Sequence, residues 1–246
     1  MSGDMLRIKN SCTLEAIDAA YSPLIQAAIA AYHAVFPQEI EEIRLMGSVA
    51  RGEAIPEVSD IDFLALVREE PSEDAQAALQ YRAAALGRTF PIVSLVDLGI
   101  SCRDNLHPTQ HFILTSDSLA VAGIDRLTLR EQLVTRDELI RLVTPSMSQL
   151  LPEYRVAVAQ LAPDDVERLR FYSRIIGKDL LKCLRGIILR CGATYERNIS
   201  AIAAQALAHF PEHAATITLL HRCYLAPTND QTVLLEALTR ATDLPS

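Results

Sequence analysis

The feature that most constrains the fold is the apolar segment IDFLALV, residues 61–67, which two aspartates introduce. Its nearly continuous apolar run predicts a buried β-strand over residues 60–67. Asp60 and Asp62 are two residues apart, so in a strand their side chains point to the same face. Two such carboxylates repel each other and lose water, and both effects oppose double ionisation. Packing alone therefore does not account for them.

Length and composition limit the class of protein. The chain has 246 residues, 50% of them hydrophobic, which suffices for one large domain or two smaller ones. The start, MSGDMLRIKN, has an acid at Asp4 and no apolar run behind a basic flank, which predicts no secretory signal. Lys and Arg interrupt the apolar stretches, which predicts no membrane span. We therefore expect a cytoplasmic protein.

Charge and cysteine content narrow the class further. The formal charge of -8 argues against a general nucleic-acid binder. The first 115 residues hold twice as many acidic as basic residues, whereas the remainder holds equal numbers, which suggests two units with different tasks. The five cysteines form no Cys-x-x-Cys pair, so reduced thiols are expected.

The apolar patterns divide the chain into a helix and strand alternation followed by helices. The expected helices cover residues 13–36 and 72–86, and the expected strands cover 43–46, 60–67 and 90–100. Residues 111–127 form one more strand or helix with a turn at Gly123. From Arg136 onward the pattern predicts a bundle of four or five helices, broken at Pro145, Pro152, Pro163, Pro211 and Pro227. The sequence thus predicts an α+β protein, with a sheet domain over residues 1–130 and an all-α helical bundle domain over 131–246.

A Gly-Ser pair lies upstream of the aspartates. Gly47 and Ser48 follow a predicted strand and precede a predicted helix, where free backbone N–H groups favour an anion. The pair alone is typical of an ordinary tight turn, and a lone Asp-x-Asp is often a solvated strand end. Taken together they favour a nucleotide site, because Mg²⁺ bound by Asp60 and Asp62 would relieve their repulsion and carry phosphates.

These residues carry a resemblance to a known family. The segment GSVARGEAIPEVSDIDFLALV resembles the signature of the DNA polymerase beta-like nucleotidyltransferase superfamily, a Gly-Ser pair followed on the next strand by Asp-x-Asp. It is most similar to the small bacterial branch, which includes the aminoglycoside nucleotidyltransferases and the minimal nucleotidyltransferases. The resemblance covers the first hundred residues and implies a mixed-sheet catalytic domain.

The family resemblance implies a third carboxylate on a later strand, and Asp97 is the only acid in residues 90–100. Its alternative is a strand-end Asp before a turn at Gly99. The implied mechanism uses two Mg²⁺ ions held by Asp60, Asp62 and Asp97, with in-line attack of a hydroxyl on the α-phosphate of an NTP and release of pyrophosphate. Whether Asp97 takes the hydroxyl proton or only binds metal stays open.

The remaining site residues are expected to contact the nucleotide. Gly47, Ser48 and Arg51 are the expected phosphate contacts, with Ser59 beside the aspartates; Arg51 could instead be a solvent-facing helix residue. A basic stripe, formed by Arg170, Arg174, Lys178, Lys182 and Arg185, is expected on one helix face. A solvated face and a triphosphate contact weigh about equally for it, and the family resemblance favours Lys178 as the residue that reaches the triphosphate.

Three functions compete. The first is a metal-dependent enzyme that transfers a nucleoside monophosphate, with ATP the expected donor, to a hydroxyl of a small molecule; an aminoglycoside-like antibiotic would suit an acidic cleft and imply a role in resistance. The second is modification of a protein or RNA partner, as in toxin–antitoxin pairs. The third is a nucleotide-binding regulator without turnover, against which the three carboxylates argue. A homodimer is compatible with the pattern, and whether two chains share the site stays open.

Overall fold

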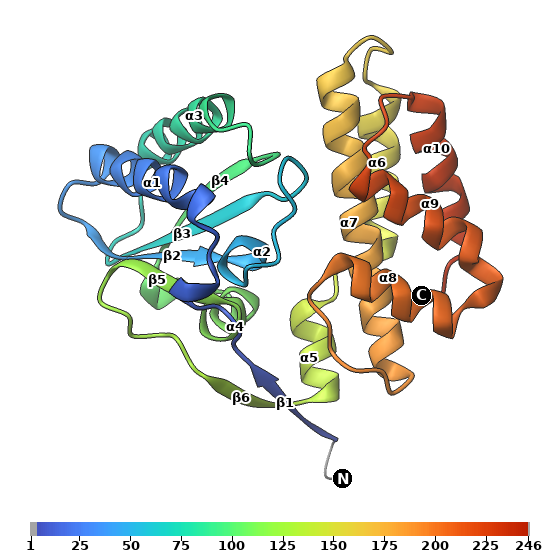
Figure 1. Ribbon diagram of the computed structural model, residues 1–246, viewed down its shortest axis with the longest axis horizontal. Coiled ribbons are helices and arrows are strands. Elements are labelled where there is room, and N and C mark those ends of the chain that lie inside the picture. Colours follow the sequence, from blue (N-terminus) through green and yellow to red (C-terminus); the bar gives the residue numbers. More distant parts are fainter. Residues whose placement is uncertain (1–3, 246) are drawn as a thin grey trace. The chain divides into compact units, whose positions relative to one another are not determined.

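The structure, a computed structural model, describes residues 4–245. Ser246 and residues 1–3, which belong to the N-terminal segment for which no secretory signal is predicted, lie outside the described residues. Backbone contacts divide the chain into two units (Figure 1). The sheet unit is residues 7–133, and the helical unit comprises residues 4–6 together with residues 134–245. The predicted class, a mixed-sheet region followed by an all-α region, is confirmed. Over residues 4–245, no helix combines the length and the apolar character that crossing a membrane requires.

The sheet unit is built on four strands in the order β4, β3, β2, β5. Their bounds are β2 Ile40–Met46, β3 Ile61–Val67, β4 Val96–Cys102 and β5 Ser118–Gly123. β2 is antiparallel to both β3 and β5, whereas β3 and β4 are parallel. The sheet is therefore mixed, and the parallel pair brings the beginnings of β3 and β4 to the same edge.

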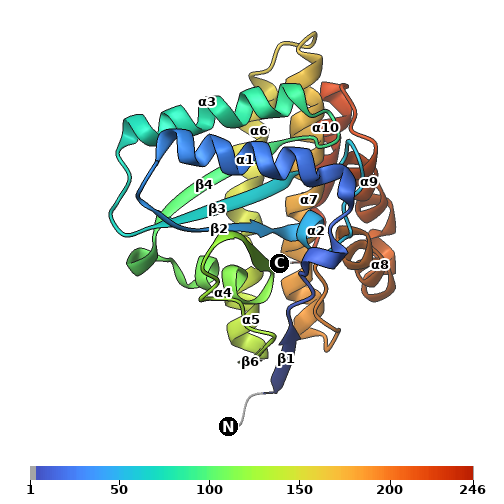
Figure 2. The ribbon, with the colours of Figure 1, turned by 60° about the vertical axis from the view of Figure 1, so that its left-hand side comes forward.

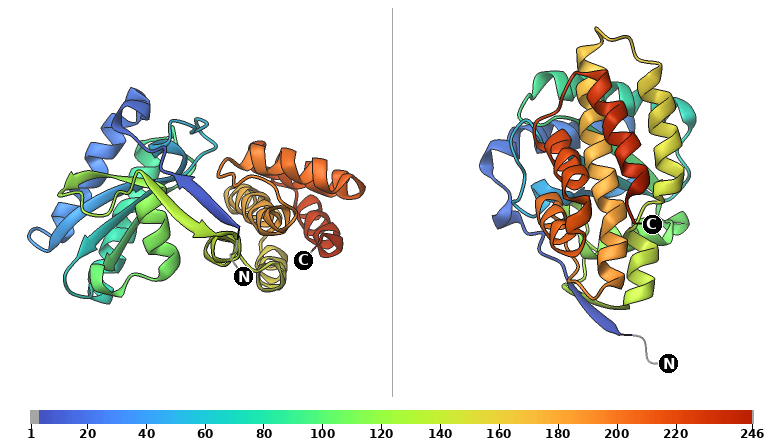
Figure 3. Two further views of the ribbon diagram at one scale, coloured as in Figure 1. Left: turned by 90° about the horizontal axis from the view of Figure 1, so that it is seen from below. Right: turned by 90° about the vertical axis from the view of Figure 1, so that its right-hand side faces the viewer.

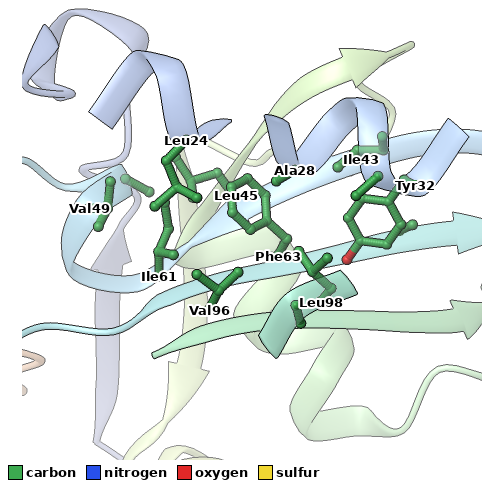
Figure 4. Packing of buried hydrophobic residues seen from close by; sticks show 14 of the residues in the cluster. Leu24, Ala28, Tyr32, Ile43, Leu45, Val49, Ile61, Phe63, Val96 and Leu98 are labelled. Carbon is green, nitrogen blue, oxygen red and sulfur yellow. The ribbon is translucent and has the colours of Figure 1, made fainter. Parts of the chain in front are cut away.

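Helices cover both faces of this sheet (Figure 2). α1 (Ser22–Val35) and α3 (Glu73–Thr89) lie on one face, and α4 (Pro108–Ser116) lies on the other. Figure 4 shows Leu24 and Tyr32 of α1 packed over Leu45, Phe63 and Leu98 of the strands. Because strand residues alternate between faces, burying Phe63 under α1 turns its neighbour Asp62 toward the other face. The core thereby fixes where that aspartate points.

The two predicted helices of the sheet unit form, with one changed boundary. Ser72 accepts a hydrogen bond from the Ala75 backbone N–H at 3.2 Å, so the predicted helix start there is confirmed. The first helix begins at Ser22 instead of Thr13. Pro23 occupies its first turn, where the missing N–H costs nothing, whereas a longer helix would place that proline in its interior. Residues 14–16 and 19–21 form 3₁₀ turns instead.

The predicted strand over residues 90–100 is wrong in its first half. Residues 90–95 form turns, and β4 begins at Val96. The turn is closed by the Val93 backbone N–H, which donates to the Phe90 carbonyl at 3.5 Å, and by the N–H of Glu57, which donates to Ile92. An apolar run by itself does not distinguish a buried turn from a buried strand. Residues 111–127 contain most of α4 and then β5, which ends at Gly123 with φ +83°.

The helical unit contains six α-helices within residues 134–245, more than the four or five predicted. They are α5 Arg136–Val143, α6 Met147–Ala159, α7 Val166–Arg190, α8 Ile199–His209, α9 Ala214–Leu225 and α10 Gln231–Arg240. α7 packs against α5, α6, α8 and α9, and these helices are coloured yellow-green to orange-red in Figure 3. Pro152 lies inside α6, so the predicted break there is wrong. Leu151 and Val158 of α6 are buried, and this packing outweighs the hydrogen bond that a proline removes.

A small two-stranded sheet forms where the chain passes between the units. It pairs β1 (Met5–Lys9) with β6 (Glu131–Thr135). The Asn10 backbone N–H donates to the Arg130 carbonyl at 3.0 Å, which extends this pairing. The residual short elements are α2 (Gly47–Ala50) and the 3₁₀ turns Arg103–Asn105, Pro211–His213 and Ala241–Asp243.

Candidate active site

Two of the predicted carboxylates lie side by side at one edge of the sheet. Asp62 is the second residue of β3 and Asp97 is the second residue of β4, and their Cα atoms are partners in the parallel register. Partner residues on neighbouring strands present their side chains to the same face. Asp62 is half-buried and Asp97 is exposed. The pair therefore combines a position fixed by the core with access from solvent.

The third carboxylate, Asp60, directly precedes β3. The Ser94 backbone N–H donates to the Ser59 carbonyl at 2.9 Å, and the Ile61 N–H donates to the Leu95 carbonyl at 3.0 Å. These two bonds continue the parallel ladder on both sides of Asp60 and hold it in an extended segment. Alternation then places its side chain on the same side as that of Asp62.

The Gly-Ser turn lies against this edge. Met46, the last residue of β2, is the register partner of Asp62, and Gly47 follows it with φ +74°. A Cβ atom added to Gly47 would lie 3.3 Å from Oδ2 of Asp62. Glycine is therefore favoured both by the left-handed backbone and by the close approach of the carboxylate. Ser48 is half-buried in the single turn of α2 that begins here.

The sequence predicts Arg51 as a phosphate contact, but in the structure its guanidinium has protein partners. Nη1 donates to both carboxylate oxygens of Asp117, at 2.7 and 2.8 Å, and Nε donates to Glu53 at 3.0 Å. The Arg51 side chain is only 7% exposed. Burial alone would lower the pKa of Arg51, but the Asp117 carboxylate beside it raises that pKa above its ordinary value. A contact between Arg51 and phosphate stays a prediction.

Ser59 also has a local partner. Its hydroxyl accepts a hydrogen bond from the Ile55 backbone N–H at 2.9 Å, and the residue is buried. The Ser59 backbone N–H donates to the Ile55 carbonyl at 2.8 Å, so Ser59 closes the turn that leads into β3. Its predicted contact with the nucleotide remains a prediction.

The predicted basic stripe lies on α7, in the helical unit. Its five residues all fall within Val166–Arg190, so the helix itself is confirmed. Lys182 lies 3.5 Å from Asp179, and Arg185 donates to the Val143 carbonyl and stacks on the Tyr195 ring. At least two members of the stripe therefore stabilise the helical unit. Lys178 is half-buried on the same helix, and its contact with a triphosphate stays a prediction.

The carboxylate edge suits a hard divalent cation that arrives with a nucleotide. Among the residues that the structure describes, His, Cys, Asp and Glu side chains do not gather in groups of three or more that could hold a metal ion by themselves. Mg²⁺ typically binds through one or two carboxylates, substrate phosphates and waters. Asp62 and Asp97 supply such oxygen donors, and the Gly47 backbone leaves room beside them. The residues present therefore fit Mg²⁺ with an NTP better than Mg²⁺ alone.

The sequence did not reveal Asp117, which contacts both Gly47 and Arg51. It lies between α4 and β5, and it follows Arg51 by 66 residues. Nothing in the local pattern around Asp117 distinguishes it from an ordinary helix end, so only the tertiary fold could identify it.

A cavity of the sheet unit lies at the opposite end of the strands. It has a volume of about 680 Å³, and Ile40 and Val67, the first residue of β2 and the last of β3, contribute to its lining. Its walls include none of the predicted site residues. The candidate site rests on the carboxylate edge and not on this cavity.

The mixed sheet, the aspartates in register and the glycine turn define the class of this protein. Residues 34–110 match the family model described as a nucleotidyltransferase domain, a segment that includes Gly47, Asp62 and Asp97. These residues therefore form a nucleotidyltransferase domain, and the chain is an enzyme of that class. The comparison with curated proteins found no match to the chain.

One solved structure shares the fold over most of both chains. It is that of spectinomycin adenyltransferase AAD(9) from Enterococcus faecialis, determined with ATP and spectinomycin, and it matches with a TM-score of 0.54. The two chains are 12% identical, and the match covers 90% of this chain and 99% of AAD(9). At this identity the likeness is one of fold, and it extends beyond the sheet unit into the helices.

Proposed function

We propose that this enzyme transfers a nucleoside monophosphate, with ATP as donor, to a hydroxyl group of a small-molecule acceptor and releases pyrophosphate. The observation that carries the proposal is the register of Asp62 and Asp97 on adjacent parallel strands, with Asp60 before the first strand. Rigid strands hold these oxygens at a fixed separation, which is what positioning of phosphates for transfer requires.

Each residue has a chemical task in this proposal. The acceptor oxygen forms a bond to the α-phosphorus while the bond from that phosphorus to the bridging oxygen of the leaving pyrophosphate breaks. The hydroxyl proton passes to a carboxylate, and the exposed position of Asp97 suits it to that step. Gly47 would let the backbone approach a phosphate closely, and Ser48 would donate a hydrogen bond to a phosphate oxygen beside Asp62.

Bound Mg²⁺, one ion or two, would be held by Asp60, Asp62 and Asp97 and would neutralise phosphate charge. Positioning and charge neutralisation supply most of the rate in phosphoryl chemistry. Asparagine keeps the size of aspartate but removes its charge, so each Asp→Asn variant should lose the metal without losing the fold.

A cationic, aminoglycoside-like molecule is the first acceptor to examine. The first 115 residues hold a twofold excess of acidic over basic residues, and an acidic surface attracts and orients a polycation. The solved relative in fold, AAD(9), was determined with spectinomycin, which adds support to this choice of acceptor.

The test is a transfer assay with NTPs labelled at the α- or the γ-phosphate, against aminoglycosides and other hydroxyl compounds. We expect α-label on the acceptor and γ-label only in pyrophosphate. Asp60→Asn and Asp62→Asn should each lower the rate by at least about a hundredfold, as removal of a transition-state charge contact does. Asp97→Asn should do the same if it accepts the proton or binds metal.

The matched control is Asp74→Asn, an exposed carboxylate in the first turn of α3, which should leave transfer unchanged. An enzyme that binds an NTP yet releases no pyrophosphate with any acceptor would contradict the proposed activity. Full activity in Asp62→Asn would show that the metal assignment is wrong.

A further inference from the structure

Asp117 connects the two ends of the Gly-Ser loop. Its backbone carbonyl accepts a hydrogen bond from the Gly47 N–H at 3.3 Å, at the start of the loop. Its carboxylate accepts both bonds from Nη1 of Arg51, just after α2. The loop is also closed internally, because the Arg51 N–H donates to the Gly47 carbonyl at 3.1 Å. One residue thus holds the backbone at one end and a side chain at the other.

Asp117 is itself held firmly. Its N–H donates to the Ile113 carbonyl at 2.8 Å, which ends α4. The next residue, Ser118, is fully buried and is the register partner of Met46, the residue before the loop. The Ser118 hydroxyl accepts from Nε of the buried Arg44 at 2.8 Å and donates to Leu114 at 2.7 Å. Asp117 is therefore a rigid support that can impose its geometry on the loop.

The Arg51–Asp117 pair is sheltered from water. The Arg51 side chain is 7% exposed and that of Asp117 is 17% exposed. A charge pair in such a setting is strong, and removing either partner leaves the other poorly compensated. The pair should therefore behave as one unit in mutational experiments.

We propose that Asp117 is a positioning residue of the phosphate-binding loop, and that Arg51 braces that loop through Asp117 instead of binding phosphate directly. The inference rests on the proposed function, because it assumes that Gly47 and Ser48 receive the phosphates. It replaces the sequence-based role of Arg51 with an indirect one and adds a residue that the Gly-Ser and Asp-x-Asp motifs do not contain.

The sign of one variant separates the two roles of Arg51. If Arg51 binds phosphate, Asp117→Asn releases Nη1 of Arg51 from a carboxylate and removes a negative charge, so ATP should bind equally well or more tightly. If Arg51 is a brace, Asp117→Asn loosens the loop, so ATP should bind more weakly. We expect a rise in the Kd of about tenfold or more, as when a supporting residue behind a ligand is removed.

The experiment measures binding of ATP with Mg²⁺ by calorimetry in the full chain. The variants are Asp117→Asn, Arg51→Gln and the double variant, at a temperature where thermal melts show each to be folded. We expect both single variants to raise the Kd for ATP. The double variant should bind ATP no more weakly than the weaker-binding single variant, because both substitutions remove the same Arg51–Asp117 interaction. Arg68→Gln is the control: it breaks the Arg68–Glu41 pair of the same unit, with Arg68 82% exposed.

The outcomes are distinguishable. If Asp117→Asn binds ATP as tightly as wild type or more tightly, the brace is refuted and the nucleotide site stands. If the single and double variants lower melting temperature but leave the Kd unchanged, the pair only stabilises the fold and the proposal is wrong. If the wild-type protein binds none of ATP, GTP, CTP and UTP in the presence of Mg²⁺, the proposed function is wrong and the proposed role of Asp117 is wrong with it.

Discussion

Replacing Gly47 by alanine should damage function far more than stability. Alanine at φ +74° lowers the unfolding free energy by about 1–2 kcal/mol through backbone strain. The lower conformational entropy of alanine in the unfolded chain raises the unfolding free energy by about 0.4–1 kcal/mol. The net loss of unfolding free energy is about 0.8 kcal/mol from the midpoints of these ranges, with limits of about 0 and 1.6 kcal/mol. The new Cβ, 3.3 Å from Oδ2 of Asp62, needs that carboxylate to move by only a few tenths of an ångström.

That small shift falls on a carboxylate that the proposed reaction uses. A misplacement of about 1 Å can cost about a hundredfold in rate, so we expect nucleotidyl transfer to fall by about tenfold or more in Gly47→Ala. Alanine also fills the space through which a phosphate would approach the backbone. Urea unfolding measures the stability change, and labelled transfer measures the rate.

Alanine variants of two other glycines with positive φ serve as controls for Gly47→Ala. Gly192→Ala, at φ +91° with open space around the added Cβ, should show a similar small stability loss and no change in transfer. Gly52→Ala would place its Cβ 2.4 Å from the Ala16 carbonyl oxygen, so the backbone must shift and a further loss of about 1–3 kcal/mol is expected. Wild-type transfer by Gly47→Ala, or an equal loss in Gly192→Ala, would refute the reasoning.

Two further predictions concern the helical unit. Burial lowers the pKa of His221, whose Nε2 lies 2.9 Å from the Ser200 hydroxyl. The unfolded chain therefore binds more protons, so the contribution of His221 to stability is fully present above about pH 6.5 and is lost as the pH drops through the lower folded pKa. His221→Gln should flatten this pH dependence in thermal melts between about pH 5 and 7.5, a range that spans the usual histidine pKa of about 6.5. Burial raises the pKa of Cys183 to about 12, whereas Cys191 is exposed, so a thiol reagent should modify Cys191 first and Cys191→Ser should remove the fast reaction; a second thiol that reacts as fast in the folded protein would contradict this.

Local patterns were sufficient where short-range physics decides the structure. The apolar run predicts β3, and the Ser72 cap predicts the start of α3, because alternation and capping depend on residues a few positions apart. The same holds for the basic helix α7 and for the glycine at the Gly47 turn. The family match confirms the class of enzyme that the Gly-Ser and Asp-x-Asp segment predicted.

The sequence did not predict the boundaries of helices and strands correctly where tertiary packing competes with local preference. Residues 90–95 are as apolar as a strand, yet they form turns that hydrogen bond to the segment before β3. Pro152 is a helix breaker by local rules, yet burial of its neighbours keeps α6 continuous.

By itself, the sequence determined which chemistry-bearing residues the chain has and which local elements carry them. Only the tertiary structure decided which of them meet. The register of Asp62 with Asp97 and the bond from Arg51 to Asp117 join segments separated by 35 and 66 residues. Such contacts follow from strand order and helix placement, which bury the apolar faces of the whole unit at once and have no signature in any short stretch of the chain.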